Sequence, residues 1–159
     1  TADDSYLLAT NGIRLEDNET AATLSGRVDT SLFDSEAPCD EKEDPEVGNR
    51  IYIYQGIDLG DRQLSDVFTN DSSATIPAGA LAPFAVATLT ENTLSGIWEY
   101  SFGYLPAGDY TMAFACDTQE DDPVDFDDLV VPQPDNQVYE LTLDEEERAV
   151  CDLDEAADC

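Results

Sequence analysis

The sequence predicts an all-β domain, an antiparallel β-sandwich of the Ig-like or prealbumin-like kind with long acidic loops. Short segments rich in β-branched and aromatic residues recur along the chain, separated by turn-forming residues. One stretch, at the C-terminal end, is a candidate helix. No unit of roughly 20–50 residues repeats, which disfavours a propeller or a solenoid. Several short strands with little helix are typical of a sandwich.

The predicted strands differ in strength. Residues 50–55, with the sequence RIYIYQ, are the strongest because they are almost entirely β-branched and aromatic. In residues 96–102, alternation places Ile97 on one face of the strand and the aromatic side chains of Trp98, Tyr100 and Phe102 on the other. In chain order the predicted strands are residues 5–8, 12–15, 23–28, 50–55, 84–89, 96–102, 110–116, 129–131 and 137–143.

The chain divides into three parts. Residues 1–22 are expected to form an extended N-terminal arm and residues 23–143 the sandwich. Residues 144–159 are an acidic tail, either a helix or a strap clasped by a disulfide. A length of 159 residues suits one such domain. Acidic loops are expected at residues 34–48 and 117–128, and an insertion at residues 56–79.

The charge is the strongest constraint on function. Thirty-seven Asp and Glu residues face six Lys and Arg, with no histidine, and the formal net charge is −31. A surface this negative repels nucleic acid, anionic lipid and phosphate-bearing substrates, so we expect no nucleic-acid partner. No run approaches the roughly 18 apolar residues of a membrane span, so no transmembrane segment is predicted.

The four cysteines predict structural disulfides. Cys39, Cys116, Cys151 and Cys159 form an even set without a CxxC pair, and the absence of histidine disfavours a zinc site. Dense carboxylates raise thiol pKa values, which disfavours a redox pair. Two disulfides place the protein in an oxidising compartment, extracellular or at the cell surface. The alternative for Cys116 is a free buried cysteine after the apolar run MAFA.

Four cysteines allow three pairings. We favour Cys39–Cys116 across the fold and Cys151–Cys159 within the tail. In a continuous helix the last two would lie about 12 Å apart, too far to bridge. If they pair, the tail must turn.

Dense carboxylates make calcium the cofactor to consider. Ca²⁺ takes oxygen ligands, often from carboxylates spaced along a loop. The best candidate ligands lie in the loop at residues 117–128 and are Asp121, Asp122, Asp125, Asp127 and Asp128. The alternative is a solvated acidic loop of a salt-adapted secreted protein.

No enzymatic activity is predicted. Without histidine the usual general base and the Ser–His and Cys–His couples are missing. No glycine-rich loop that cradles phosphate is present. Paired carboxylates occur by chance in any protein this acidic, and no feature of the sequence singles out one pair.

The aromatic face of residues 96–102 has two interpretations. Trp98 and Tyr100 form either a platform on which sugars stack or part of the core, and alternation favours the core.

The turn at residues 106–109 is expected to shape the fold. Leu105 fills the core, Pro106 fixes its own φ and Gly108 tolerates a positive φ. The Tyr110 hydroxyl either bonds back to the loop backbone, as in a tyrosine corner, or Tyr110 is ordinary strand filling.

Two segments carry a resemblance to known modules. Residues 96–111, GIWEYSFGYLPAGDYT, resemble the closing hairpin of prealbumin-like and carboxypeptidase-regulatory-like sandwiches, in which a Y-x-F-x-x-L-P-A-G-x-Y phrase marks the last core strands. Residues 25–28, SGRV, are similar to their usual first strand.

More closely, the chain resembles the C-terminal half of an uncharacterised domain family of bacterial envelope lipoproteins. The likeness rests on residues 82–86 (APFAV), residues 105–111 (LPAGDYT) and Cys116-Asp117 followed by Asp121-Asp122. It spans roughly residues 20–143 and implies a sandwich fold in the bacterial envelope, while such folds host many roles. The acidic loop at residues 34–48 and the tail with Cys151 and Cys159 depart from the simple module.

Two classes of function follow. The first is a non-catalytic extracellular or cell-surface structural module, a subunit of a surface polymer in which residues 2–15 complete the sheet edge of a neighbouring copy. The alternative for this arm is pairing within its own domain. The second class is a carbohydrate- or protein-binding module of an envelope lipoprotein.

Overall fold

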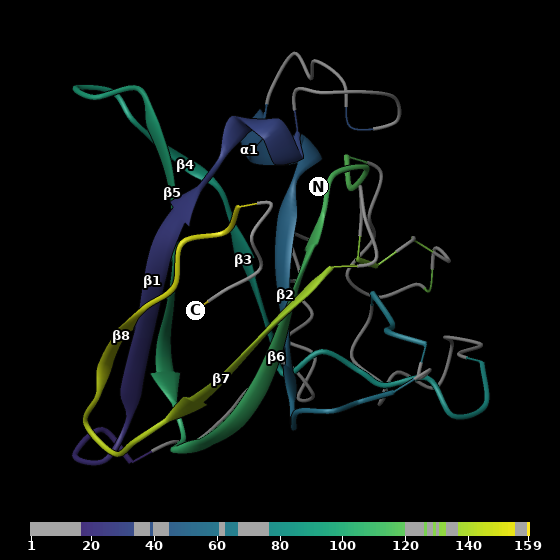
Figure 1. Cartoon of the computed structure of the whole chain (residues 1–159), viewed down its shortest axis with the longest axis vertical. Helices are drawn as coiled ribbons and strands as arrows, with labels where there is room; N and C mark the ends of the chain where they lie inside the picture. The colour runs from purple at the N-terminus through teal and green to yellow at the C-terminus, as the bar shows by residue number, and fades with distance from the viewer. Residues whose placement is uncertain are drawn as a thin grey trace, which may run out of the picture.

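The computed structural model describes residues 17–33, 39, 45–60, 63–66, 77–119, 126, 129, 131–132, 137–154 and 159. Two four-stranded sheets pack face to face, which confirms the predicted all-β sandwich (Figure 1). The elements are β1 (Ala22–Val28), a 3₁₀ turn (Thr30–Leu32), α1 (Pro45–Gly48), β2 (Arg50–Gln55), β3 (Ala85–Thr88), β4 (Thr90–Asn92), β5 (Ile97–Leu105), β6 (Gly108–Ala115), β7 (Val138–Leu143) and β8 (Arg148–Val150).

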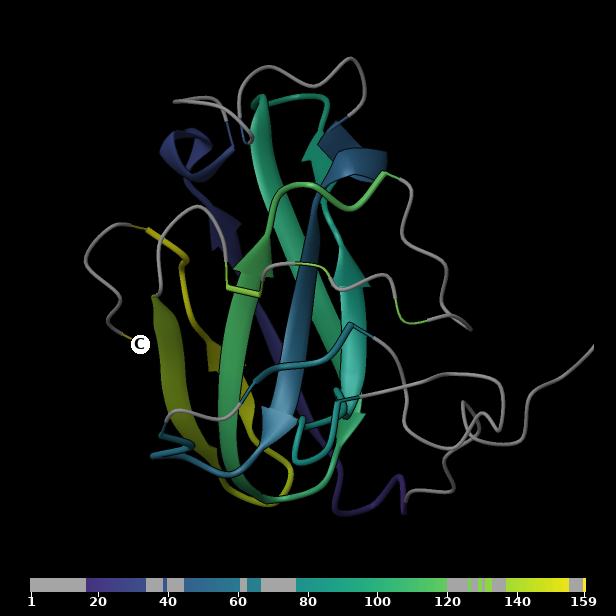
Figure 2. The same ribbon diagram turned by 90° about the vertical axis from the view of Figure 1, so that its right-hand side faces the viewer.

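The two sheets have different strand orders. Sheet A has the order β4-β5-β1-β8 and sheet B the order β3-β2-β6-β7. All neighbours pair antiparallel except β1 and β8, which run parallel. In Figure 1 sheet A lies to the left of sheet B, and Figure 2 looks onto sheet B.

The core between the sheets follows from alternation in the strands. In β1, every second residue is buried (Ala22, Leu24, Gly26 and Val28), while the residues between them are exposed. In β5, the aromatic side chains that alternation grouped together point inward. Their burial removes apolar surface from water, the main driving force for joining the sheets.

The two central strands of sheet B, β2 and β6, are buried on both faces over residues 51–54 and 110–115. Ile51 and Ile53 of β2 belong to the core between the sheets, whereas Tyr52 and Tyr54 lie in a second apolar cluster with Leu64; all four β2 side chains are fully buried. Parts of the segment after β2 cross the outer face of the sheet (Figure 2). A strand buried on two sides has no polar alternation, which explains why residues 50–55 gave the strongest strand signal.

The prediction of one strand at residues 84–89 needs a correction. The chain changes sheets at Leu89, whose side chain is 1% exposed. The part before it, β3, pairs with β2 in sheet B, and the part after it, β4, pairs with β5 in sheet A. Leu129 and Val131, also expected to be extended, belong to no strand. The candidate strands at residues 5–15 lie outside the described residues.

The acidic tail belongs to the sandwich. Residues 148–150 form β8 beside β1, and Leu153, three residues later, is 1% exposed in the core. Its run of carboxylates forms the tight turn between β7 and β8, where Glu146 has a positive φ of 59°. The described part of this segment is neither a helix nor an appendage of the domain.

The turn between β5 and β6 is a tyrosine corner. Tyr110 is 1% exposed, and its hydroxyl donates a hydrogen bond of 2.8 Å to the carbonyl of Pro106. Leu105 is fully buried and Gly108 has φ 151°, as the sequence suggested. The bond satisfies a buried hydroxyl and fixes the turn at the same time.

Tyr110→Phe is expected to lower the free energy of unfolding by about 1 kcal/mol, because it leaves the partly buried Pro106 carbonyl without this donor. Chemical denaturation monitored by tryptophan fluorescence measures the change. The matched control is Tyr104→Phe, since Tyr104 is 59% exposed. Equal effects of the two substitutions would contradict a stabilising corner.

Candidate functional site: the C-terminal clasp and the outer face of sheet A

Two disulfides join the predicted pairs of cysteines. Cys39 bonds to Cys116 with a Cα–Cα distance of 5.1 Å, and Cys151 bonds to Cys159 at 4.8 Å. Cys116 directly follows β6, so the first bond ties residue 39 to the end of a central strand. The second bond closes a short loop, for which the tail has to turn back.

The C-terminal segment from Glu146 to Leu153, which includes β8, hydrogen-bonds to the chain along the whole length of β1. Parallel pairing of β8 with β1 covers Thr23 to Ser25, and further main-chain bonds continue the contact in both directions. These bonds run from Glu146 N to Thr20 O (3.2 Å), Thr23 N to Glu147 O (2.8 Å), Cys151 N to Ser25 O (3.0 Å), Leu153 N to Arg27 O (2.8 Å) and Asp29 N to Leu153 O (2.9 Å). We call β8, residues 151–154 and the Cys151–Cys159 disulfide the C-terminal clasp.

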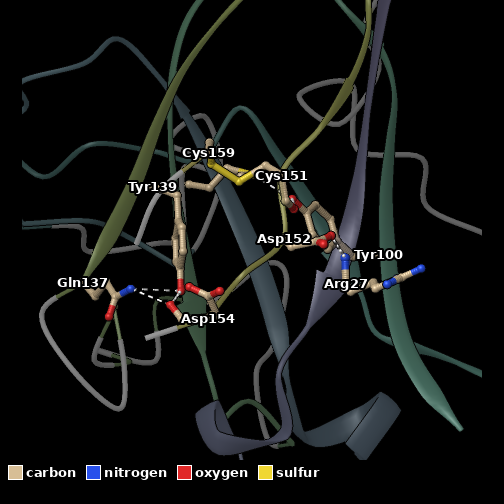
Figure 3. The surroundings of a disulfide bond; sticks show 9 residues. Arg27, Tyr100, Gln137, Tyr139, Cys151, Asp152, Asp154 and Cys159 are labelled. Carbon is tan, nitrogen blue, oxygen red and sulfur yellow. Dashed lines mark hydrogen bonds between the residues drawn. A yellow bond between two sulfur atoms is a disulfide. The ribbon is translucent and has the colours of Figure 1, made fainter. Parts of the chain in front are cut away.

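The clasp approaches β1 most closely at Gly26. A Cβ atom added to Gly26 would lie 1.7 Å from the Cys151 carbonyl oxygen and 2.9 Å from a ring carbon of Tyr100. The Tyr100 hydroxyl donates to that same oxygen at 2.8 Å (Figure 3). Glycine is required here because backbone and an aromatic ring occupy the space of a side chain.

At Asp152 of the clasp, a side-chain oxygen serves as the acceptor for a main-chain N–H of β1. Its Oδ1 accepts a hydrogen bond of 2.8 Å from the Arg27 main-chain N–H. The Arg27 side chain points away from Tyr100, toward the outside of the sheet (Figure 3). The clasp therefore keeps its register with β1 through Cys151 and Asp152.

Tyr139 fastens the end of the clasp to sheet B. Its hydroxyl and the Gln137 side-chain amide each donate to the Asp154 carbonyl at 2.7 Å. Burial, and then the Asp154 carboxylate, raise the pKa of Tyr139 to about 12. Burial also raises the pKa of Tyr100, with smaller contributions from Asp152 and Tyr139. Both hydroxyls therefore stay protonated and act as donors at physiological pH.

The aromatic residues predicted as a ligand platform lie at the core. Tyr100 is 3% exposed and Phe102 4% exposed. Trp98 is half-buried and packs edge-on against Phe33, with ring centroids 5.8 Å apart. Tyr100 is therefore a core residue that holds the clasp, and a sugar ring cannot stack on it while the sandwich is closed.

The predicted calcium ligands Asp121, Asp122, Asp125, Asp127 and Asp128 lie outside the described residues. Within the ranges that the structure describes, no group of three or more Asp, Glu, Cys or His side chains is placed to hold a metal ion. Calcium at the loop of residues 117–128 stays a prediction. The described ranges also contain no helix long and apolar enough to cross a bilayer.

A shallow trough of about 880 Å³ crosses sheet A. It extends from the clasp over β1 and β5 to the end of β3, where the chain passes from sheet B to sheet A. Its lining residues are Ser25, Gly26, Arg27, Val86, Ala87, Thr88, Thr90, Glu99, Tyr100, Ser101, Val150 and Asp152. The trough was not predictable from local sequence patterns, because it forms only when four segments far apart in the chain come together.

A second hollow of about 650 Å³ lies on the opposite side, over sheet B. Apolar side chains, including Leu59, Leu64 and Val138, line it together with Asp58 and Glu140. The Asp58 main-chain N–H donates to Glu140 Oε1 at 2.7 Å, so one of the two carboxylates positions the loop.

No family model, no curated protein and no solved structure matches this chain.

Gly26→Ala is expected to lower the free energy of unfolding by about 3 kcal/mol or more, because the new methyl group overlaps the Cys151 carbonyl and β8 must move away. Thermal unfolding measured by circular dichroism gives the change. Gly103→Ala is the matched control on β5, since a Cβ there meets no atom within 4 Å. If the two variants melt together, the close approach at Gly26 does not hold the clasp.

The two disulfides are expected to contribute unequally. A chain-entropy account gives about 4.5 kcal/mol for Cys39–Cys116, which closes 77 residues, and about 2.5 kcal/mol for Cys151–Cys159, which closes 8. Guanidinium unfolding of C39A/C116A and C151A/C159A compares them. A larger loss in C151A/C159A would show that the clasp does more than close a loop.

Proposed function

We propose that this chain is a non-catalytic structural module of an extracellular or cell-surface assembly, a subunit of a surface polymer. The observation that carries the proposal is the use of buried tyrosines. Four of them, each no more than 3% exposed, donate their hydroxyl to a main-chain carbonyl in a loop or in the clasp. The pairs are Tyr54 with Ser65, Tyr100 with Cys151, Tyr110 with Pro106 and Tyr139 with Asp154.

These bonds support a mechanical role. A buried hydroxyl needs a partner, and here each partner belongs to a loop or to the clasp, so each bond adds a tie between that segment and a sheet. The insertion after β2, the β5–β6 turn and the clasp are each fastened to a sheet in this way. A domain whose loops are tied to its sheets keeps its shape when neighbouring subunits exert force on it.

Two disulfides and the acidic surface support the location. Disulfides persist in oxidising compartments outside the cytosol. The net charge of −31 keeps copies soluble and apart until salt screens it. The resemblance of residues 20–143 to a domain family of envelope lipoproteins supports the bacterial envelope.

Strand donation is the proposed mechanism of assembly. The donor is the segment before Asp17, in which Tyr6, Leu7, Leu8, Ile13 and Leu15 are apolar. The proposed acceptor is the outer edge of β5, because β4 pairs only with its first three residues, Ile97 to Glu99. Among the described strands, none pairs with that edge from Tyr100 onward. An open edge offers main-chain donors and acceptors to a strand from another copy.

The full chain is expected to form concentration-dependent oligomers in 1 M NaCl, whereas residues 17–159 are expected not to polymerise, because the donor strand is missing. The cut falls before Asp17 because Thr20, in the turn that begins there, accepts a hydrogen bond from Glu146 in the turn before β8. Sedimentation velocity measures both species.

The control is a full-length L7D/L8D variant, which keeps the length of the donor but removes its apolar character. It should behave like the truncated chain. Chains that polymerise equally with and without residues 1–16 would contradict donation by this segment, and monomers throughout would contradict the proposed function.

A further inference from the structure

The outer face of sheet A differs in charge from the rest of the molecule. On its four strands, most residues that alternate with the core residues are exposed on this outer face, and so is Asp152 of the clasp beside Arg27. We call this surface the neutral face; it consists of Thr23, Ser25, Arg27, Thr90, Glu99, Ser101, Gly103, Arg148, Val150 and Asp152.

Two positive and two negative side chains balance on this face. Arg27 and Arg148 are two of only six basic residues in the chain, whose net charge is −31. Glu99 lies directly opposite Arg27 in the register of β1 and β5, and Asp152 bonds to the Arg27 main chain. The Arg50 guanidinium, by contrast, is engaged within the chain, where it donates hydrogen bonds to three main-chain carbonyls in and just after α1. Two of the ten residues of the neutral face are therefore basic, against six of the 159 residues of the chain.

The neutral face is uneven, with a protruding side chain beside a hollow. Val150 is 70% exposed and stands beside Ser25, which in turn is opposite Ser101. These small side chains form part of the trough of about 880 Å³. A protruding apolar side chain and a hollow thus lie on the same surface. At the lower end, a bulge in β5 leaves Tyr104 59% exposed, with φ 56°.

The central part of the opposite face of the sandwich is covered. Leu59, Leu64 and Leu81 from the segment after β2 pack over Tyr52 and Tyr54 of sheet B. Within the described residues, no apolar cluster of this kind covers the outer face of sheet A, where outward side chains of β1, β5 and β8 are exposed. In the described part of the chain, sheet A is therefore the sheet with the more open central face.

We propose that a second copy of this chain binds to the neutral face, with the two sheets A packed face to face about a two-fold axis. Over most of the surface two copies repel each other, so the neutral face is where they approach at the lowest electrostatic cost. A two-fold contact is self-complementary: it sets Arg27 or Arg148 of one copy against Glu99 or Asp152 of the other, and Val150 against the hollow. The inference rests on the proposed function, because it adds a lateral contact to the same assembly.

The contact is weak and strengthens with salt. The neutral face has ten residues, against roughly 20–30 on each side of a standard interface. Raising the salt from 0.1 M to 1 M shortens the screening length from about 10 Å to about 3 Å, which suppresses the repulsion between the remaining acidic surfaces. Association held mainly by ion pairs would weaken under the same change.

The test uses the full-length L7D/L8D chain, in which strand donation is removed, at concentrations up to about 1 mM in 1 M NaCl. Sedimentation equilibrium should show monomers and dimers. Adding Arg27→Glu should raise the dimer Kd at least about tenfold, because it sets a carboxylate in direct contact with Glu99 or Asp152 of the other copy, closer than the salt screens. The exchange R27E/E99R should return the Kd to within about threefold of the parent, because the face is neutral again.

The charge-matched control is Q55E/Q119E, which adds the same two negative charges at exposed residues outside the neutral face. It should change the Kd less than threefold. Near-ultraviolet circular dichroism checks that each variant is folded. A parent that stays monomeric at 1 mM, or equal weakening by R27E and Q55E/Q119E, overturns the proposal. Because strand donation is tested by residues 1–16 and the lateral contact by Arg27, each can fail without the other.

Discussion

The pairing of the last strand with the first is the contact on which the rest of the structure depends. After β7 ends in sheet B, the chain crosses to sheet A. There β8 closes the edge of the sheet, and Leu153 after it enters the core. The pairing is possible because Gly26 lets the Cys151 carbonyl lie where a side chain would be. Tyr100 and Tyr139, one from each sheet, then hold the clasp by its main-chain oxygens (Figure 3). One chain segment thus joins both sheets, and loss of its register would open the core.

The distribution of charge explains how a chain with a net charge of −31 folds. The inward faces of β1, β2 and β6 carry no charged side chain, so these strands bring no carboxylate into the core between the sheets. Asp66, outside these strands, is buried and accepts a hydrogen bond of 3.1 Å from the Leu129 main-chain N–H. Among the described residues, carboxylates gather at turns such as the one between β7 and β8, where they stay hydrated. Repulsion between them is relieved by screening at the surface, whereas a buried carboxylate would need a partner. The core is therefore that of an ordinary sandwich.

Much of the core was predictable, because alternation and aromatic content are local signals. They identified β1, β2, β5, β6 and β7. The phrase around Pro106 left a tyrosine corner as one of two alternatives for Tyr110, and the structure has the corner. The clasp was not predictable as a strand, because RAV is short and lies among acidic residues, and its partner is more than 120 residues away. One local feature of the sequence does point to the clasp: Gly26 is an isolated glycine inside a strand pattern, which indicates close approach of another backbone. The neutral face required the register of four strands, which the sequence does not contain.

The clasp supplies three residues of the neutral face. Arg148, Val150 and Asp152 belong to the clasp, whereas Arg27, Ser25 and Glu99 belong to β1 and β5, so the face exists only when the clasp is in register. Arg27 shows the link directly: its main-chain N–H holds Asp152, while its side chain stands on the face. Binding of a second copy to the closed form alone would stabilise the clasp by mass action, and loosening the clasp would weaken binding by the same free energy. The proposed lateral contact would therefore be coupled to the closure of the sandwich through one strand, and the Cys151–Cys159 disulfide would favour both.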